Sequence, residues 1–85
     1  MERYELRFKA SVAKDLRPLP RKDVRRILAR IEDLAEDPRC PGSEKLAGQE
    51  RYRVRQGDYR IVYEIRDEVL VVVVVKVAHR RDAYR

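Results

Sequence analysis

The C-terminal residues of the chain combine three side-chain types that can act together on a nucleic acid. His79, Arg80, Arg81 and Tyr84 follow directly after the valine-rich run at 69–77. An imidazole can accept a proton near neutral pH, a guanidinium binds phosphate oxygens as a fork, and a phenol ring can stack on a base. A lone histidine can equally be structural, and a lone tyrosine near the chain end more often only packs against apolar residues there. Because the run supplies a rigid platform, we expect function at its end.

Two alternating segments, 51–56 and 59–66, are typical of strands and are separated only by Gly57-Asp58. A glycine in the first position of a two-residue loop is compatible with a type II′ turn, and this loop length fixes the pairing. The predicted cross-strand pairs are Arg55 with Arg60, Val54 with Ile61, Arg53 with Val62 and Tyr52 with Tyr63.

The predicted hairpin therefore gathers Arg53, Arg55 and Arg60 on one face. Like charges directly opposite each other in a sheet cost about 0.2–1 kcal/mol, so the pair of Arg55 and Arg60 needs an explanation. Two explanations are compatible with the sequence. The side chains extend into solvent or meet carboxylates such as Glu64 and Glu50, or the face binds phosphates, whose oxygens match the guanidinium fork.

The sequence lacks the residues that several other kinds of catalytic site require. One histidine, one cysteine and no clustered carboxylates argue against a zinc site, and no glycine-rich phosphate loop is present. Ser11 and Ser43 have no histidine or acid at a spacing that indicates a catalytic triad. If the protein is an enzyme, chemistry on a phosphate without metal or cofactor is what remains.

The elements that must position these residues can be read from the hydropathy pattern. Residues 4–9 alternate as an edge strand, and a short helix is expected over 11–16 with Ser11 as its N-cap. A second helix is expected over 21–36, where apolar residues form one stripe. The run at 69–77 is apolar on both faces, which is the pattern of a central strand.

Length and charge limit the function further. The 85 residues, 42% of them charged, predict one domain spanning 1–85, and the net charge of +6 favours an anionic partner, either nucleic acid or an acidic protein segment. The single Cys40 and the lack of a signal-peptide pattern predict a cytoplasmic protein. The longest apolar run is shorter than the roughly 18–20 residues that span a bilayer, so no membrane role is expected.

Three blocks of the sequence resemble the RelE/ParE superfamily of toxin–antitoxin toxins. They are Lys45-Leu46-Ala47-Gly48, the hairpin at 52–65 and the segment at 77–84. The resemblance is greater to the RelE branch, and it implies an α+β fold in which two N-terminal helices pack on a small antiparallel sheet, in the order β-α-α-β-β-β. It also implies a ribosome-dependent endoribonuclease that cuts mRNA without metal, by attack of a 2′-hydroxyl on the adjacent phosphodiester.

The resemblance implies a role for each matching residue. Arg53 and Arg55 match a basic pair, Arg60 an arginine that stabilises the transition state, Arg80 an arginine linked to leaving-group protonation, and Tyr84 a tyrosine that stacks on the substrate base. Some relatives have lysine in place of Arg53 and Arg55. Because arginine keeps its proton, neither is a credible general base, and we assign proton abstraction to His79.

Two other functions remain open from the sequence. ParE-like toxins share the fold and inhibit DNA gyrase through protein contacts, and a basic RNA-binding module without activity is a third reading. Either toxin reading implies a cognate antitoxin with an acidic, partly disordered segment as partner, and the nuclease reading adds the ribosome and mRNA. The basic outer surface of the helix at 21–36 is by default a solvated face.

Overall fold

The computed structural model describes residues 3–48 and 50–79, and it confirms the α+β class and the two N-terminal helices. Its elements in chain order are β1 (Glu5–Phe8), α1 (Ala10–Leu16), α2 (Arg21–Glu36), β2 (Glu44–Lys45), β3 (Arg51–Gln56), β4 (Tyr59–Arg66), a 3₁₀ turn η1 (Asp67–Val69) and β5 (Val71–His79). The short strand β2 was not predicted, because two residues are too few to show an alternating pattern.

The strands form one sheet in the order β1-β5-β4-β3-β2. β1 lies at an edge, as predicted, but it runs parallel to β5, whereas the other neighbouring strands are antiparallel. The expected wholly antiparallel sheet is therefore corrected to a mixed one. A parallel pair needs a long connection, and the two helices and the hairpin between β1 and β5 supply it.

Of the two helices, α2 follows the sequence pattern closely and α1 follows it less closely. α2 has the predicted bounds, and Pro20 occupies its N-cap position. α1 begins one residue early: the extended residue before it is Lys9, so Ser11 lies inside the first turn and is not the N-cap. No helix in the described part of the chain is long and apolar enough to cross a membrane.

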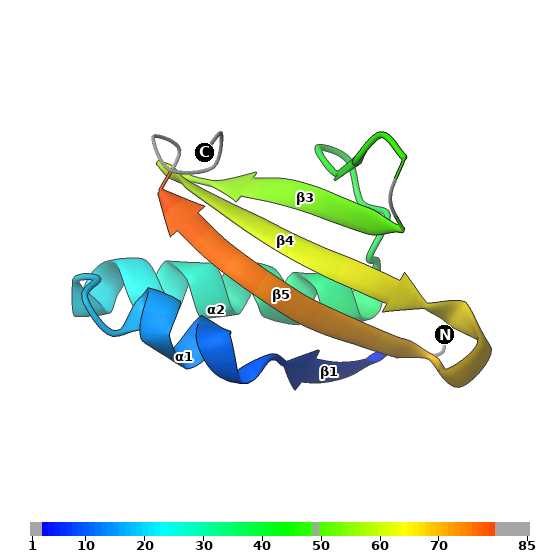
Figure 1. Ribbon diagram of the computed structural model, residues 1–85, viewed down its shortest axis with the longest axis horizontal. Helices are drawn as coiled ribbons and strands as arrows, with labels where there is room; N and C mark the ends of the chain where they lie inside the picture. The colour runs from blue at the N-terminus through cyan, green and yellow to red at the C-terminus, as the bar shows by residue number, and fades with distance from the viewer. Residues whose placement is uncertain (1–2, 49, 80–85) are drawn as a thin grey trace.

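Both helices cover the same face of the sheet, and the core lies between the two layers (Figure 1). α2 buries Ile27, Ile31 and Leu34 in this core. Tyr63 is fully buried there, and its hydroxyl donates a hydrogen bond of 2.6 Å to the carbonyl oxygen of Pro38. We call the opposite side of the sheet the open face. Residues that alternate with the core positions point toward it.

The β3–β4 hairpin has the predicted register, with Arg55 opposite Arg60 and Val54 opposite Ile61. Gly57 has a φ of +59°, as the first position of a type II′ turn requires.

The last strand begins at Val71 rather than at residue 69. Val69 belongs to η1, and Leu70 takes a left-handed conformation with a φ of 52° that turns the chain into β5. β5 lies inside the sheet between β1 and β4, as the two-sided apolar pattern predicted.

Candidate nucleic-acid interface

Three arginines line a cavity on the open face. Val54 and Ile61 are buried beneath the helices, so their neighbours Arg53, Arg55 and Arg60 project from the other side of β3 and β4. Arg60 is only 8% exposed, whereas Arg55 is exposed and Arg53 is intermediate. The cavity has a volume of about 350 Å³, and its lining residues are Gly42, Glu44, Arg53, Val54, Arg55 and Arg60. We call it the arginine cavity.

One carboxylate shares the arginine cavity, and the sequence did not single it out. Glu44 pairs with Arg53 across the β2–β3 ladder, and its carboxylate lies 2.9 Å from the Arg53 guanidinium. The Glu44 side chain is 66% exposed, so the ion pair stands at the mouth of the cavity rather than deep within it. Only the strand β2 brings this carboxylate to the arginines, and β2 carries no recognisable sequence signal.

The carboxylates expected near the arginines have other partners. Glu64 accepts hydrogen bonds from Arg51 at 3.1 Å and from Arg66 at 2.9 Å. Glu50 forms its ion pair with Lys45, at 3.8 Å. Within residues 3–48 and 50–79, Arg55 takes part in none of the ion pairs. Of the possibilities left open by the sequence, an ion pair of Arg55 with Glu64 or Glu50 does not form, and the exposed Arg55 leaves the cavity with more cationic than anionic lining residues.

A second, smaller cavity adjoins the first. It has a volume of about 110 Å³, and its lining residues are Leu46, Arg53, Arg60, Val62, Lys76 and Ala78. Arg53 and Arg60 belong to both cavities. Lys76 joins them from β5, where it pairs with Val62. The sequence placed Lys76 inside an apolar strand and offered no reason to group it with the arginines.

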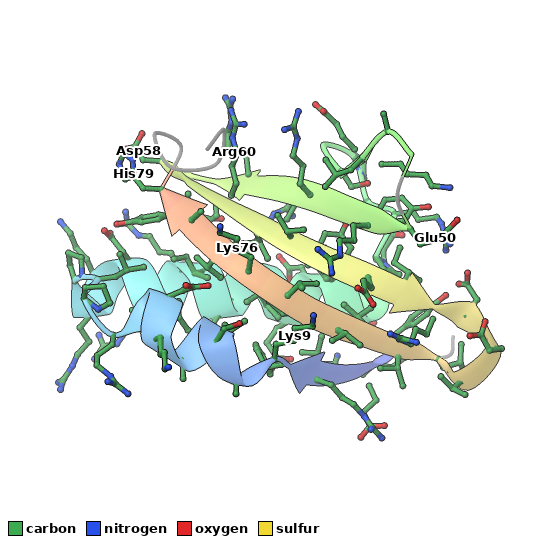
Figure 2. All side chains as sticks on the ribbon, viewed as in Figure 1. Lys9, Glu50, Asp58, Arg60, Lys76 and His79 are labelled. Atoms are coloured by element: carbon green, nitrogen blue, oxygen red, sulfur yellow. The ribbon has the colours of Figure 1, made fainter. Side chains whose placement is uncertain are left out.

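His79 stands at the same end of the sheet as Arg60 but on the other face (Figure 2). It pairs with Tyr59, while its neighbour Ala78 pairs with Arg60. The His79 and Tyr59 rings meet edge to face with their centroids 5.7 Å apart. The Tyr59 hydroxyl donates a 2.8 Å hydrogen bond to Asp23 on α2, which marks this side as the helix-covered face and raises the pKa of Tyr59.

The cavity beside His79 shares no lining residue with the arginine cavity, but Lys76 and Ala78 line both this cavity and the smaller one. The cavity beside His79 has a volume of about 360 Å³ and lies between α1 and the ends of β4 and β5, with Lys14, Asp15, Tyr59 and His79 among its lining residues. The sequence placed His79 and Arg80 near the same sheet as the arginine face; His79 lies at the same end of that sheet as Arg60 but on its other face. Arg80, Arg81 and Tyr84 lie outside the described residues.

The charged cluster at the opposite end of the sheet holds β1 and η1 in place. Arg39 binds both carboxylate oxygens of Asp67, at 3.1 and 2.8 Å, and the Tyr4 hydroxyl donates to the same carboxylate at 2.7 Å. These hydrogen bonds, that from Arg39 first, lower the pKa of Asp67 to about 2. Among the described residues no group of three or more histidine, cysteine or acidic side chains is arranged to hold a metal ion.

Comparison with known proteins gives a consistent set of relatives. The family model described as the ParE toxin of the type II toxin–antitoxin system parDE matches residues 6–84. Toxin RelG of Mycobacterium tuberculosis is 38% identical over 90 residues, covering 96% of this chain and 97% of the relative. A RelE1 toxin of Methanocaldococcus jannaschii, described as putative, is 26% identical over 92 residues.

Solved structures of toxin–antitoxin complexes have the same fold. The RelBE2 complex of Mycobacterium tuberculosis contains a chain that matches with a TM-score of 0.82 and 30% identity, over 92% of this chain and 99% of that one. The RelE–RelB complex of Pyrococcus horikoshii contains one with a TM-score of 0.81 and 31% identity, over 98% and 100% of the two chains.

Proposed function

Because the chain belongs to the ParE toxin family of type II toxin–antitoxin systems, within the RelE/ParE superfamily, we propose that it is a RelE-like endoribonuclease that cleaves mRNA on the ribosome and so inhibits translation. The observation that carries this proposal is the arginine cavity, which three arginines line on the open face of the sheet. Guanidinium forks match phosphate oxygens, and a gyrase inhibitor that works through protein contacts has no need of such a cavity.

The proposed reaction is an internal transfer of the phosphodiester. The 2′-oxygen of one nucleotide bonds to the adjacent phosphorus while the bond from phosphorus to the 5′-oxygen breaks, which leaves a 2′,3′-cyclic phosphate and a 5′-hydroxyl. The 2′-hydroxyl proton must go to a base, and the departing 5′-oxygen must receive a proton. The phosphate carries extra negative charge in the transition state, so preorganised cations accelerate the step.

We assign that stabilisation to Arg60 and the clamping of the phosphate to Arg53 and Arg55. Arg60 is the most buried of the three, and a buried cation is less screened by water and therefore acts more strongly on nearby charge. Arg53 and Arg55 are more exposed and can meet the RNA as it enters. Arg80 as proton donor, Tyr84 as stacking residue and Arg81 as a phosphate contact remain proposals based on the resemblance.

Two side chains compete for the role of proton acceptor. His79 is the acceptor proposed from the sequence, but its ring faces Tyr59 on the helix-covered side. Glu44 has its carboxylate in the same cavity as the three arginines. A general base must lie within hydrogen-bond reach of the proton it removes, and this requirement of geometry comes before that of pKa. We therefore favour Glu44 as the acceptor, and we keep His79 as the alternative that the variants below distinguish.

The partner that we propose is a cognate antitoxin with an acidic segment. The solved relatives from Mycobacterium tuberculosis and Pyrococcus horikoshii are complexes of a toxin with its antitoxin, and the +6 charge of this chain suits an acidic partner. We expect the antitoxin to cover the helices and part of the arginine face. Charge reversal of Arg53, Arg55 and Arg60 should weaken antitoxin capture; unchanged capture would contradict the second half of this expectation.

Gyrase inhibition is a second candidate function, because the matching family is that of the ParE toxin. A ParE-like protein would inhibit DNA gyrase without cutting RNA. A supercoiling assay with purified gyrase, run beside primer extension on translated mRNA, separates the two: we expect new mRNA ends and unaffected supercoiling. RNA binding that weakens with salt, without mRNA cleavage and without inhibition of supercoiling, would indicate an RNA-binding module. In each case we propose that the protein acts in the cytoplasm.

A further inference from the structure

A β-bulge turns Lys76 toward the open face. Val62 pairs with Lys76 and Tyr63 pairs with Val74, so Val75 is an extra residue in β5. Val74 is fully buried in the core, and without the bulge the alternation of the strand would direct Lys76 into that core as well. The extra residue reverses the alternation, so that Lys76 faces outward and Val77 returns to the core beside Ile61.

The position that Lys76 reaches is already rich in positive charge. It lines the smaller cavity together with Arg53 and Arg60, and that cavity adjoins the arginine cavity through these two residues. Lys76 is exposed, and none of the ion pairs among residues 3–48 and 50–79 involves it. The two cavities together are lined by four cationic side chains and one carboxylate, that of Glu44, so the region favours the binding of a further anion.

Bulges are enriched next to active sites, where they redirect a side chain. We propose that Lys76 binds a second backbone phosphate of the RNA, next to the scissile phosphate held by Arg53, Arg55 and Arg60. This inference rests on the proposed function. Lysine suits the role because its ammonium is a compact charge on a flexible stem, which follows a neighbouring phosphate without fixing its orientation. Lys76 is thus a positioning residue, and the chemistry stays in the arginine cavity.

The direct test is the salt dependence of RNA binding. Wild type and Lys76→Gln are titrated against a single-stranded RNA that carries 2′-O-methyl groups and cannot be cleaved. Loss of one phosphate contact should reduce the slope of log affinity against log salt by about 0.7. The ratio of the wild-type association constant to that of Lys76→Gln should accordingly fall about threefold between 50 and 200 mM salt. Lys76→Arg should restore the wild-type slope.

Lys9→Gln is the matched control, since it removes the same charge from an exposed residue that lines neither cavity. Its slope should stay at the wild-type value. Equal slopes for wild type and Lys76→Gln would overturn the proposal, as would an equal reduction in Lys9→Gln. A variant that binds RNA normally but loses antitoxin affinity would also overturn it, because the anion would then belong to the partner protein.

Cleavage of ribosome-bound mRNA separates this inference from the function on which it rests. Lys76→Gln should raise the toxin concentration for half-maximal cleavage and leave the limiting rate within about twofold of wild type. This is expected when the lost contact holds the bound RNA and the transition state equally strongly. A large fall in limiting rate would make Lys76 catalytic and contradict the positioning role. If wild type shows no cleavage, the nuclease proposal fails, and the binding slopes still decide the role of Lys76.

Discussion

The Glu44 carboxylate lies 2.9 Å from the Arg53 guanidinium at the mouth of the arginine cavity. The pair joins the first strand after the helices to the hairpin, and it puts the carboxylate among three cations. An RNA phosphate that reaches Arg53 must displace this carboxylate or share the guanidinium with it. In the reaction that we propose, Glu44 therefore has opposite effects on the binding of RNA and on the chemical step.

Glu44→Gln should separate these two effects. Removing the charge frees Arg53 for phosphate, so we expect equal or tighter binding of uncleavable RNA. If Glu44 accepts the 2′-hydroxyl proton, the single-turnover cleavage rate should fall by about 10²–10⁴-fold. His79→Ala is the companion variant. Loss of cleavage in His79→Ala with full activity in Glu44→Gln would make His79 the acceptor and contradict our preference.

Arg60 should matter more to the reaction rate than to the binding of RNA. Arg60→Lys keeps a positive charge but loses the fork, and Arg60→Ala loses both. We expect the limiting cleavage rate of Arg60→Ala to fall by about 10²–10³-fold, the usual effect of deleting one preorganised transition-state contact. Because Arg60 is buried, thermal unfolding of each variant must first show that the fold is retained. A fall confined to binding would contradict its assigned role.

The turn at Gly57 should be required for the alignment of Arg55 with Arg60. With a φ of +59° and no atom near the position of a β-carbon, Gly57→Ala is disfavoured by its backbone conformation rather than by a clash. We expect a loss of about 1–2 kcal/mol in the free energy of unfolding. Asp58→Ala, in the same loop but without a positive φ, is the control. Equal urea midpoints for the two variants would argue against this account of the turn.

Tyr63 should make the protein less stable in alkali. Burial raises the pKa of its phenol from 10 to about 12. Between these values the folded protein keeps a proton that the unfolded chain releases, so stability falls as pH rises, by up to about 1.4 kcal/mol per pH unit.

Tyr63→Phe should remove that alkaline component. It should also cost about 1 kcal/mol at neutral pH, because the Pro38 carbonyl loses its hydrogen-bond donor. Urea unfolding of both proteins at pH 8, 10 and 11 measures the difference. A constant difference between them over this range would show that the Tyr63 phenol does not couple to folding.

The sequence predicted well wherever a short-range rule decides the structure. The bounds of α2 follow from an apolar stripe and flanking prolines, and the register that pairs Arg55 with Arg60 follows from a two-residue loop with glycine first. The arginine face could therefore be predicted from the residues of the hairpin alone. The same rules gave Ser11 too much weight, since the extended residue before α1 is Lys9.

What the sequence did not reveal depends on features without a local pattern. A bulge within five consecutive valines leaves no mark on the hydropathy, because both faces of that strand are apolar. The sequence pattern therefore indicated only a structural role for Lys76 within this strand. Glu44 reaches Arg53 only through a two-residue strand, and the parallel pairing of β1 with β5 depends on the path of the whole chain. Long-range contacts set all three.

We propose that this chain cuts mRNA and that Arg60 stabilises the transition state of the reaction. The most direct measurement is the mapping of mRNA 5′ ends in cells after induction of wild type and of a folded Arg60→Ala variant. We predict new 5′-hydroxyl ends within translated regions for wild type, and their loss in Arg60→Ala. Growth arrest by wild type without new ends would show that the toxin does not act by cutting mRNA, and the same new ends in both proteins would show that Arg60 is not required for cleavage.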